Sequence, residues 1–204
     1  MDIMGNELTI TKAGDTRQQI LDTAKDIILG KGFTAVGLNE ILVCAGVPKG
    51  SFYHYFKSKE QFGVSLLEDY FDGYLSQLEL TLKDNGSNIS SRLLTFFQAW
   101  LDSQSSDHTA DKCLVVKLSA EVTDLSETMR ITLKNGTDRV IDRLTRFVAE
   151  GIAQGEFPAE LDAKNVTAEI YYMWIGATLL TKVSRTRDAL ERAMHATKSR
   201  LALD

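Results

Sequence analysis

The chain has 204 residues, of which 44% are apolar and 25% charged, and its net charge is −5. This length fits one domain or two small ones, and this composition excludes a globally disordered chain. No segment reaches the roughly 18 apolar residues of a membrane span, and the N-terminus lacks the pattern of a signal peptide. The sequence therefore predicts a cytoplasmic protein with no membrane partner, whose two cysteines are free thiols.

Residues 1–15 are polar, and we expect them to form a flexible arm. A first helix is expected from Thr16, because T-R-Q-Q offers a capping box with Gln19. Apolar residues then recur at helical spacing: Ile20, Ala24, Ile27 and Ile28. Gly30 and Gly32 are expected to end this helix, with Phe33 packed beside the turn.

A short second helix is expected over Leu38–Ala45, and a third from Pro48 to about Phe56. A tight turn of small residues joins them. The segment Val47–Lys59 holds three lysines and no acid, although the whole chain is acidic. A partner that carries phosphate would therefore have to bind locally, because the overall field repels it.

The rest of the chain also reads as helical. Ser58 to Gln61 forms another capping box, which predicts a long helix from Lys59 to about Asn85. We expect a polar loop over Asp102–Asp111. Five further helices are expected over residues 89–101, 112–122, 127–154, 163–184 and 187–203. With few prolines and no convincing strand, the sequence predicts an all-α fold of about nine helices.

Two short helices joined by a tight turn are typical of a helix-turn-helix, whose second helix lies in the major groove of DNA. Phe52 and Phe56 are four residues apart and are expected to point inward. The predicted DNA contacts are Lys49, Gly50, Ser51, Tyr53, His54, Tyr55, Lys57 and Lys59. The alternative, an aromatic core turn in some other helical protein, would leave the lysines and outward rings unexplained.

The segment A-G-V-P-K-G-S-F-Y-H-Y-F-K-S-K-E-Q-F resembles the recognition segment of the TetR family of bacterial repressors. The resemblance covers roughly residues 16–66. It implies an arm over residues 1–15, a helix-turn-helix domain over 16–58, and a helical ligand-binding and dimerisation domain over 59–204. It also implies a repressor, not an enzyme, that binds double-stranded DNA at an inverted repeat as a homodimer and responds to a small-molecule inducer.

A dimer also follows from the mechanism, because one short helix reads too few bases to be selective. The apolar helix around Val166–Leu180 is the candidate interface. Its expected contact residues, with one from the last helix, are Tyr171, Trp174, Leu179 and Leu190. The alternative, that this helix is the central core element, stays open at this stage.

The stretch D-K-C-L-V-V-K-L-S-A-E-V-T-D-L-S-E-T-M-R resembles the N-ethylmaleimide-responsive branch of the same family, which implies sensing of electrophiles or oxidants. Cys113 is expected to open a helix, with Lys112 adjacent and Lys117 one turn on, and these features favour a thiolate. Lys182 is either a buried amine that points at Cys113 or a lysine that extends to solvent. The alternative for Cys113 is a small buried hydrophobe, and we expect Cys44 to be one.

A second hypothesis keeps the repressor but replaces covalent sensing with reversible binding of an aromatic or hydrophobic ligand. Its pocket would be lined by Phe96, Phe97, Trp100, Tyr171, Tyr172 and Trp174. A thiol-dependent enzyme is disfavoured, because no histidine is placed to serve Cys113 as a base. His108 and its acidic neighbours match no known metal spacing, so the sequence predicts neither a metal nor a cofactor.

Overall fold

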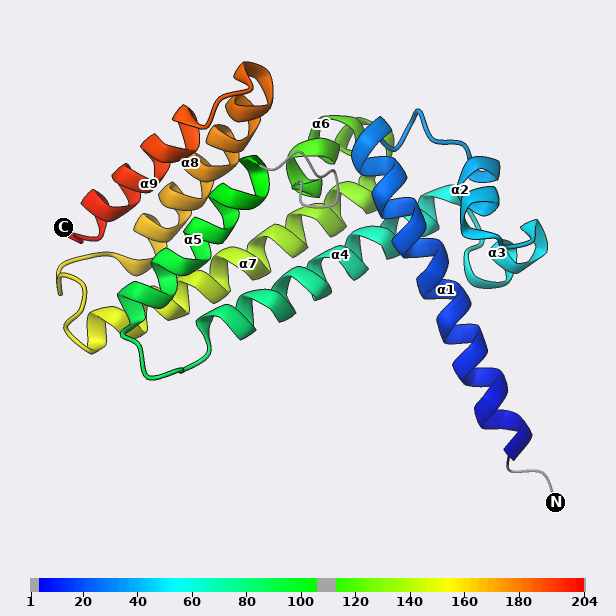
Figure 1. Cartoon of the computed structure of the whole chain (residues 1–204), viewed down its shortest axis with the longest axis horizontal. Coiled ribbons are helices and arrows are strands. Elements are labelled where there is room, and N and C mark those ends of the chain that lie inside the picture. The colour runs from blue at the N-terminus through cyan, green and yellow to red at the C-terminus, as the bar shows by residue number, and fades with distance from the viewer. Residues whose placement is uncertain (1–3, 106–112, 204) are drawn as a thin grey trace. The chain divides into compact units, whose positions relative to one another are not determined.

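The structure is a computed structural model that describes residues 4–105 and 113–203. Within these residues the chain forms nine helices and no strand, which confirms the all-α prediction (Figure 1). The helices are α1 (Met4–Lys31), α2 (Leu38–Ala45), α3 (Lys49–Tyr55), α4 (Lys59–Leu82), α5 (Ile89–Ser105), α6 (Leu114–Leu125), α7 (Glu127–Ala153), α8 (Ala163–Ser184) and α9 (Asp188–Arg200).

The chain divides into two compact units. The first unit contains Met1–Tyr70 and Lys117–Leu133, so it includes α1 to α3 and the corner between α6 and α7. The second unit contains Phe71–Val116 and Lys134–Asp204, and in it α8 packs along α9 and beside α5 (Figure 1). Among the described residues, no helix is long and apolar enough to span a membrane, and no group of acids, histidines and cysteines could hold a metal ion.

The first helix begins earlier than predicted. The predicted helix start at Thr16 is wrong, because α1 runs without a break from Met4. Residues 4–15 of the predicted arm are therefore helical, and residues 1–3 lie outside the described residues. Extending an existing helix costs little per residue, whereas starting one is expensive, so a packed helix can continue into a stretch that holds no proline. Gln19 does not close a capping box, and its Nε2 instead donates to the Ala45 carbonyl on α2 at 2.8 Å.

The end of α1 follows the sequence closely. Gly32 adopts a φ of +94°, and its N–H donates to the Ile28 carbonyl at 2.7 Å. Glycine enters this left-handed region without the steric cost that a Cβ brings. Phe33 is buried directly after the turn, as predicted.

The turn between α2 and α3 depends on Gly46, which caps α2 at a φ of 63°. The Val47 N–H then donates to the Leu42 carbonyl at 3.0 Å, which closes the end of α2. Phe52 and Phe56 are buried, as predicted, and their ring centroids lie 5.0 Å apart. Together with Phe62 on α4 they form an aromatic core under α3.

The start of α4 matches the predicted capping box. The Ser58 hydroxyl accepts a hydrogen bond from the Gln61 N–H at 3.0 Å, and the Gln61 side chain accepts from the Lys57 N–H at 2.7 Å. These bonds satisfy backbone donors that a helix start leaves without partners. These two hydrogen bonds therefore fix how the end of α3 is joined to α4.

The second unit has an aromatic core between α5, α8 and α9. Phe97 stacks on Trp174 with ring centroids 4.8 Å apart, and Trp100 lies 5.6 Å from Trp174. The Trp100 indole donates to Thr178, and the Trp174 indole donates to Thr197 at 2.9 Å. Each buried indole N–H thus has a partner, which removes the cost of burying it.

Two carboxylates cap helices in this unit. Asp162 accepts from the N–H groups of Lys164 and Asn165 at the start of α8, which was predicted to begin at residue 163. Glu156, which was not predicted to act, accepts from the N–H groups of Ile89 and Ser90 at 2.8 Å each, at the start of α5. It lies 67 residues from Ile89, so no local motif could reveal this cap.

Candidate functional site

The outer face of α3 carries the predicted DNA contacts. Lys49, Tyr53, His54 and Lys57 are exposed, and the Tyr53 side chain keeps 53% of its surface open. Ser51 and Tyr55 are half-buried. Because the Phe52 and Phe56 rings hold α3 from below, these outward side chains stand on a rigid helix.

Gly50 has no side chain, so the backbone of the first turn of α3 is uncovered there. A Cβ built at this residue would meet no atom within 4 Å, so nothing in the folded chain requires a glycine there. A glycine that the fold does not require suits a surface at which the backbone approaches another molecule closely.

Lys59 is placed differently from the expectation. Its Nζ donates to the Val36 carbonyl at 2.8 Å and lies 5.0 Å above the Phe33 ring. The ammonium therefore connects the start of α4 to the loop between α1 and α2. Contact between Lys59 and phosphate stays a prediction.

Cys113 directly precedes the first residue of α6, as predicted, and is half-buried. Its N–H donates to Gln104 Oε1 on α5 at 3.0 Å, and Gln104 is itself buried. The thiol lies near two phenols. Burial raises the pKa of Tyr171, and so does the nearby charge of Cys113, against a hydrogen bond with Thr137 that lowers it.

Tyr74 on α4 shares this environment. Burial raises its pKa well above the ordinary value, and the charges of Tyr171 and Cys113 raise it further. Both phenols therefore stay protonated at neutral pH. Tyr74 and Gln104 were not predicted to neighbour Cys113, because neither belongs to a motif and only the packing of α4 and α5 brings them to the cysteine.

Of the lysines predicted to act on Cys113, Lys117 and Lys182 lie within the described residues. Lys117 Nζ donates to the Gly30 carbonyl at the end of α1, at 3.4 Å. Lys182 is exposed, so the prediction of a buried amine is wrong. The alternative, a lysine that extends to solvent, agrees with this exposure. Lys182 follows Thr181, which is on the buried face of α8, by one residue, and a step of 100° turns it outward. Lys112 and His108 lie outside the described residues.

Cys44 is exposed, so the prediction that it packs in the core is wrong. On α2 the buried residues are Ile41, Leu42 and Ala45, which leaves Cys44 beside the exposed Val43. The helical pattern alone could not decide this, because the helix is short and apolar on more than one side. The protein thus has one exposed thiol and one half-buried thiol.

The candidate interface helix α8 has two faces. Its inner face includes Tyr171 and Trp174, which are buried in the core with Leu190 of α9. Of the four predicted interface residues only Leu179 is exposed, so the core alternative holds for the other three. The outer face is a second apolar stripe, which we call the α8 outer face: Tyr172, Leu179, Leu180 and Val183, with Gly176 open between them.

The aromatic residues predicted to line a ligand pocket pack mainly against one another. Phe96, Phe97, Trp100, Tyr171 and Trp174 are all buried in ring-to-ring contacts. Tyr172 does not join them, because 64% of its side chain is exposed on the opposite face of α8. Their role as a ligand site stays a prediction.

The short helix α3 exposes Lys49, Tyr53 and His54 above an aromatic core, and a larger helical unit accompanies it. This arrangement is typical of a helix-turn-helix transcriptional regulator. Residues 20–63 match the family described as bacterial regulatory proteins of the tetR family. Residues 90–197 match the tetracyclin repressor-like C-terminal domain. The chain belongs to the TetR family and is a repressor of the TetR type.

Among its relatives, the repressor NemR of Escherichia coli K12 is 39% identical over 188 residues, which are 92% of this chain and 94% of NemR. The regulator AcuR of Cereibacter sphaeroides is 30% identical over 85% of this chain and 79% of AcuR. The crystal structure of reduced E. coli NemR matches with a TM-score of 0.85 at 40% identity, over 91% of this chain and 96% of that one. These relatives confirm the resemblance drawn from the sequence.

Proposed function

We propose that this repressor binds an inverted-repeat operator as a homodimer and leaves it when an electrophile or oxidant modifies Cys113. The observation that carries the proposal is the position of a half-buried thiol at the start of α6, in a chain 39% identical to NemR. The partial positive charge of a helix N-terminus favours the thiolate, which is the reactive form of cysteine.

The chemistry needs only the cysteine and the electrophile. The Cys113 thiolate adds to the electron-poor carbon of a conjugated double bond, and the displaced electron pair is protonated by water at the neighbouring carbon. An oxidant instead converts the thiolate to a sulfenic acid. Both products add atoms to the side chain of Cys113, whose backbone N–H is bonded to Gln104 and whose charge acts on Tyr74 and Tyr171.

Operator binding would use the exposed face of α3 twice, once in each half-site. Lys49, Tyr53 and His54 would reach base edges and Lys57 the phosphates, while the aromatic core keeps α3 in place. Half-sites of such dimers lie about one helical turn, ~34 Å, apart or a multiple of that. A coupling of about 1–3 kcal/mol between the two sites gives several-fold to about hundredfold release.

The α8 outer face would form the dimer. An exposed stripe of Tyr172, Leu179, Leu180 and Val183 would be costly in water and can bury the same residues of a second copy. Because an isologous interface uses one patch twice, a single helix face is enough to build it.

The test replaces each of the two cysteines, Cys44 and Cys113, in turn. Purified Cys44→Ser and Cys113→Ser proteins are mixed with DNA from the region upstream of the coding sequence, and operator binding is followed by gel shift before and after N-ethylmaleimide. We expect release of Cys44→Ser, which keeps Cys113, and no release of Cys113→Ser. Release of both proteins to the same extent would contradict sensing at Cys113.

Treatment with hypochlorite and then a thiol reductant separates the covalent proposal from reversible ligand binding. Oxidative release should be reversed by the reductant and should be absent in Cys113→Ser. An aromatic ligand that releases Cys113→Ser as well as wild type would support the reversible alternative instead.

A further inference from the structure

The corner between α6 and α7 lies in the same compact unit as the helix-turn-helix, and Glu121 of α6 contacts the turn between α1 and α2. Its Oε2 accepts hydrogen bonds from the Thr34 N–H at 3.0 Å and from the Thr34 hydroxyl at 2.9 Å. The Phe33 N–H also donates to this carboxylate. Three donors on two adjacent residues therefore converge on one side chain.

Gly32 makes room for this contact. A Cβ at this residue would lie 2.3 Å from Glu121 Oε1, closer than any real contact allows. The same glycine adopts a φ of +94°, so it serves both the left-handed turn and the seat of the carboxylate.

The carboxylate of Glu121 is held in its charged form. Burial alone would raise its pKa, but the hydrogen bonds from Thr34 and Phe33 and the charge of Lys117 outweigh it, so the pKa lies below the ordinary value. Lys117 Nζ in turn donates to the Gly30 carbonyl. Through two side chains of opposite charge, α6 holds the end of α1 and the turn that follows it.

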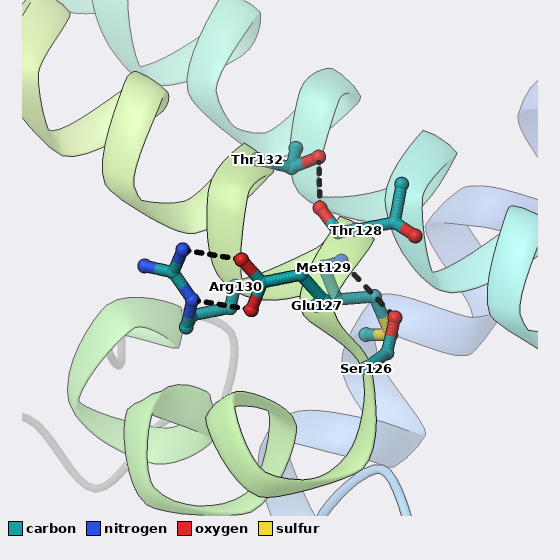
Figure 2. Close-up of polar contacts among 6 residues, drawn as sticks. All are labelled: Ser126, Glu127, Thr128, Met129, Arg130 and Thr132. Atoms are coloured by element: carbon teal, nitrogen blue, oxygen red, sulfur yellow. Dashed lines mark hydrogen bonds and ion pairs between the residues drawn. The ribbon is translucent and has the colours of Figure 1, made fainter.

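A second attachment lies at the start of α7. Ser126 accepts a hydrogen bond from the Met129 N–H at 3.2 Å, which caps α7 (Figure 2). The Ser126 hydroxyl also donates to Glu60 in the first turn of α4. Met129 packs so closely on α4 that a Cβ at Gly63 would lie 2.6 Å from its Cε. The α6–α7 corner thus contacts two separate parts of the DNA-binding unit, the turn after α1 and the first turns of α4.

We propose that Glu121 is the positioning residue that transmits a change at Cys113 to the DNA-binding helices, an inference that rests on the proposed function. α6 is continuous over Leu114–Leu125, with Cys113 before its first residue and Glu121 about 12 Å further along its axis at ~1.5 Å per residue. A group added at Cys113 displaces the first turn of α6. Because the helix moves as a unit, the carboxylate shifts on Phe33 and Thr34, and α2 begins four residues later.

The experiment uses a Cys44→Ser background, so that N-ethylmaleimide reacts at Cys113 alone. Hydrogen exchange of the peptide that spans residues 32–36 is measured before and after alkylation, and the operator Kd is measured on the same samples. Glu121→Ala removes the contact, and Glu121→Gln keeps an oxygen that can accept from Thr34. Asp124→Asn is the matched control, since Asp124 is exposed on the same helix and its carboxylate makes no hydrogen bond or ion pair with any described residue.

We expect alkylation to raise exchange over residues 32–36 at least fivefold in the background protein and in Asp124→Asn. Before alkylation, Glu121→Ala should bind the operator within threefold of the background protein. After complete alkylation, shown by mass spectrometry, its Kd should rise less than threefold, against tenfold or more for the background. Glu121→Gln should recover part of the response.

Two failures can be told apart. If alkylation raises exchange over residues 32–36 but the background protein stays on the operator, the transmission stands and the proposed function fails. If alkylated Glu121→Ala releases DNA as fully as the background does, or exchange over residues 32–36 does not change on alkylation, the role of Glu121 is overturned. Loss of operator binding in untreated Glu121→Ala would also overturn it, because it would show a purely structural role.

Discussion

The recognition turn of the first unit and the α8 helix of the second show how differently two apolar-rich segments use their side chains. In α3 and at its C-cap the inward rings, Phe52 and Phe56, have exposed polar and basic neighbours, so one face is buried and the other is exposed. α8 is apolar on both faces, with Trp174 buried on one and Leu180 exposed on the other. A helix that is apolar all round is expected to be buried on every side, and the exposed face of α8 therefore fits the proposed dimer.

The largest effect is expected in the core face of α8. Trp174→Ala removes the stack on Phe97 and the hydrogen bond to Thr197, so the free energy of unfolding should fall by about 3–5 kcal/mol. Urea unfolding followed by circular dichroism measures this loss.

Leu180→Asp on the other face of α8 should leave the fold intact but yield a monomer in sedimentation at concentrations where wild type is a dimer. A stable dimer of Leu180→Asp would contradict the proposed dimer interface on the α8 outer face.

A smaller effect is expected on the outer face of α3. Tyr53→Ala removes an exposed ring, so stability should change by less than about 0.5 kcal/mol while operator affinity falls by about 1–3 kcal/mol, roughly fivefold to 150-fold. Fluorescence anisotropy with labelled operator measures the Kd, and the salt dependence should stay steep because the lysines remain. If Tyr53→Ala binds as tightly as wild type, α3 does not read DNA through this ring.

The smallest effect concerns Glu156 at the start of α5. Burial raises its pKa, but hydrogen bonds from Ser90 and Ile89 and the charge of Arg92 outweigh burial and hold the pKa below its ordinary value. The stabilisation is therefore complete above the unfolded pKa, near 4.3, and is lost as the pH falls through the folded value.

Glu156→Gln should accordingly lower the free energy of unfolding by about 1 kcal/mol at pH 7 and by less near pH 3. Urea unfolding at several pH values measures the difference. Glu160→Gln, at an exposed acid four residues away, serves as the control. A difference that is the same at every pH would exclude a charged cap.

Much of the DNA-binding unit was predictable, because its signals are local. The capping box of Ser58 and Gln61, the stop at Gly32 and the spacing of Phe52 and Phe56 each depend on residues close in sequence. The same local reasoning failed at Thr16, where a favourable cap sequence lies inside a continuous helix. A capping motif shows that a helix can start at a residue, but it does not show that the preceding residues are non-helical.

The all-helical class, the end of α1 and the start of α4 could be predicted from residues close in sequence, since backbone geometry and short-range hydrogen bonds decide these. The family was inferred from the resemblance of the recognition segment. The packing of the helices was needed to establish the burial of Cys44 and Lys182, the neighbours of Cys113, and the contact of Glu121 with Thr34. Glu121 and Thr34 are 87 residues apart. Such pairs meet only when helices pack, and no periodicity along one helix records which neighbour it will meet.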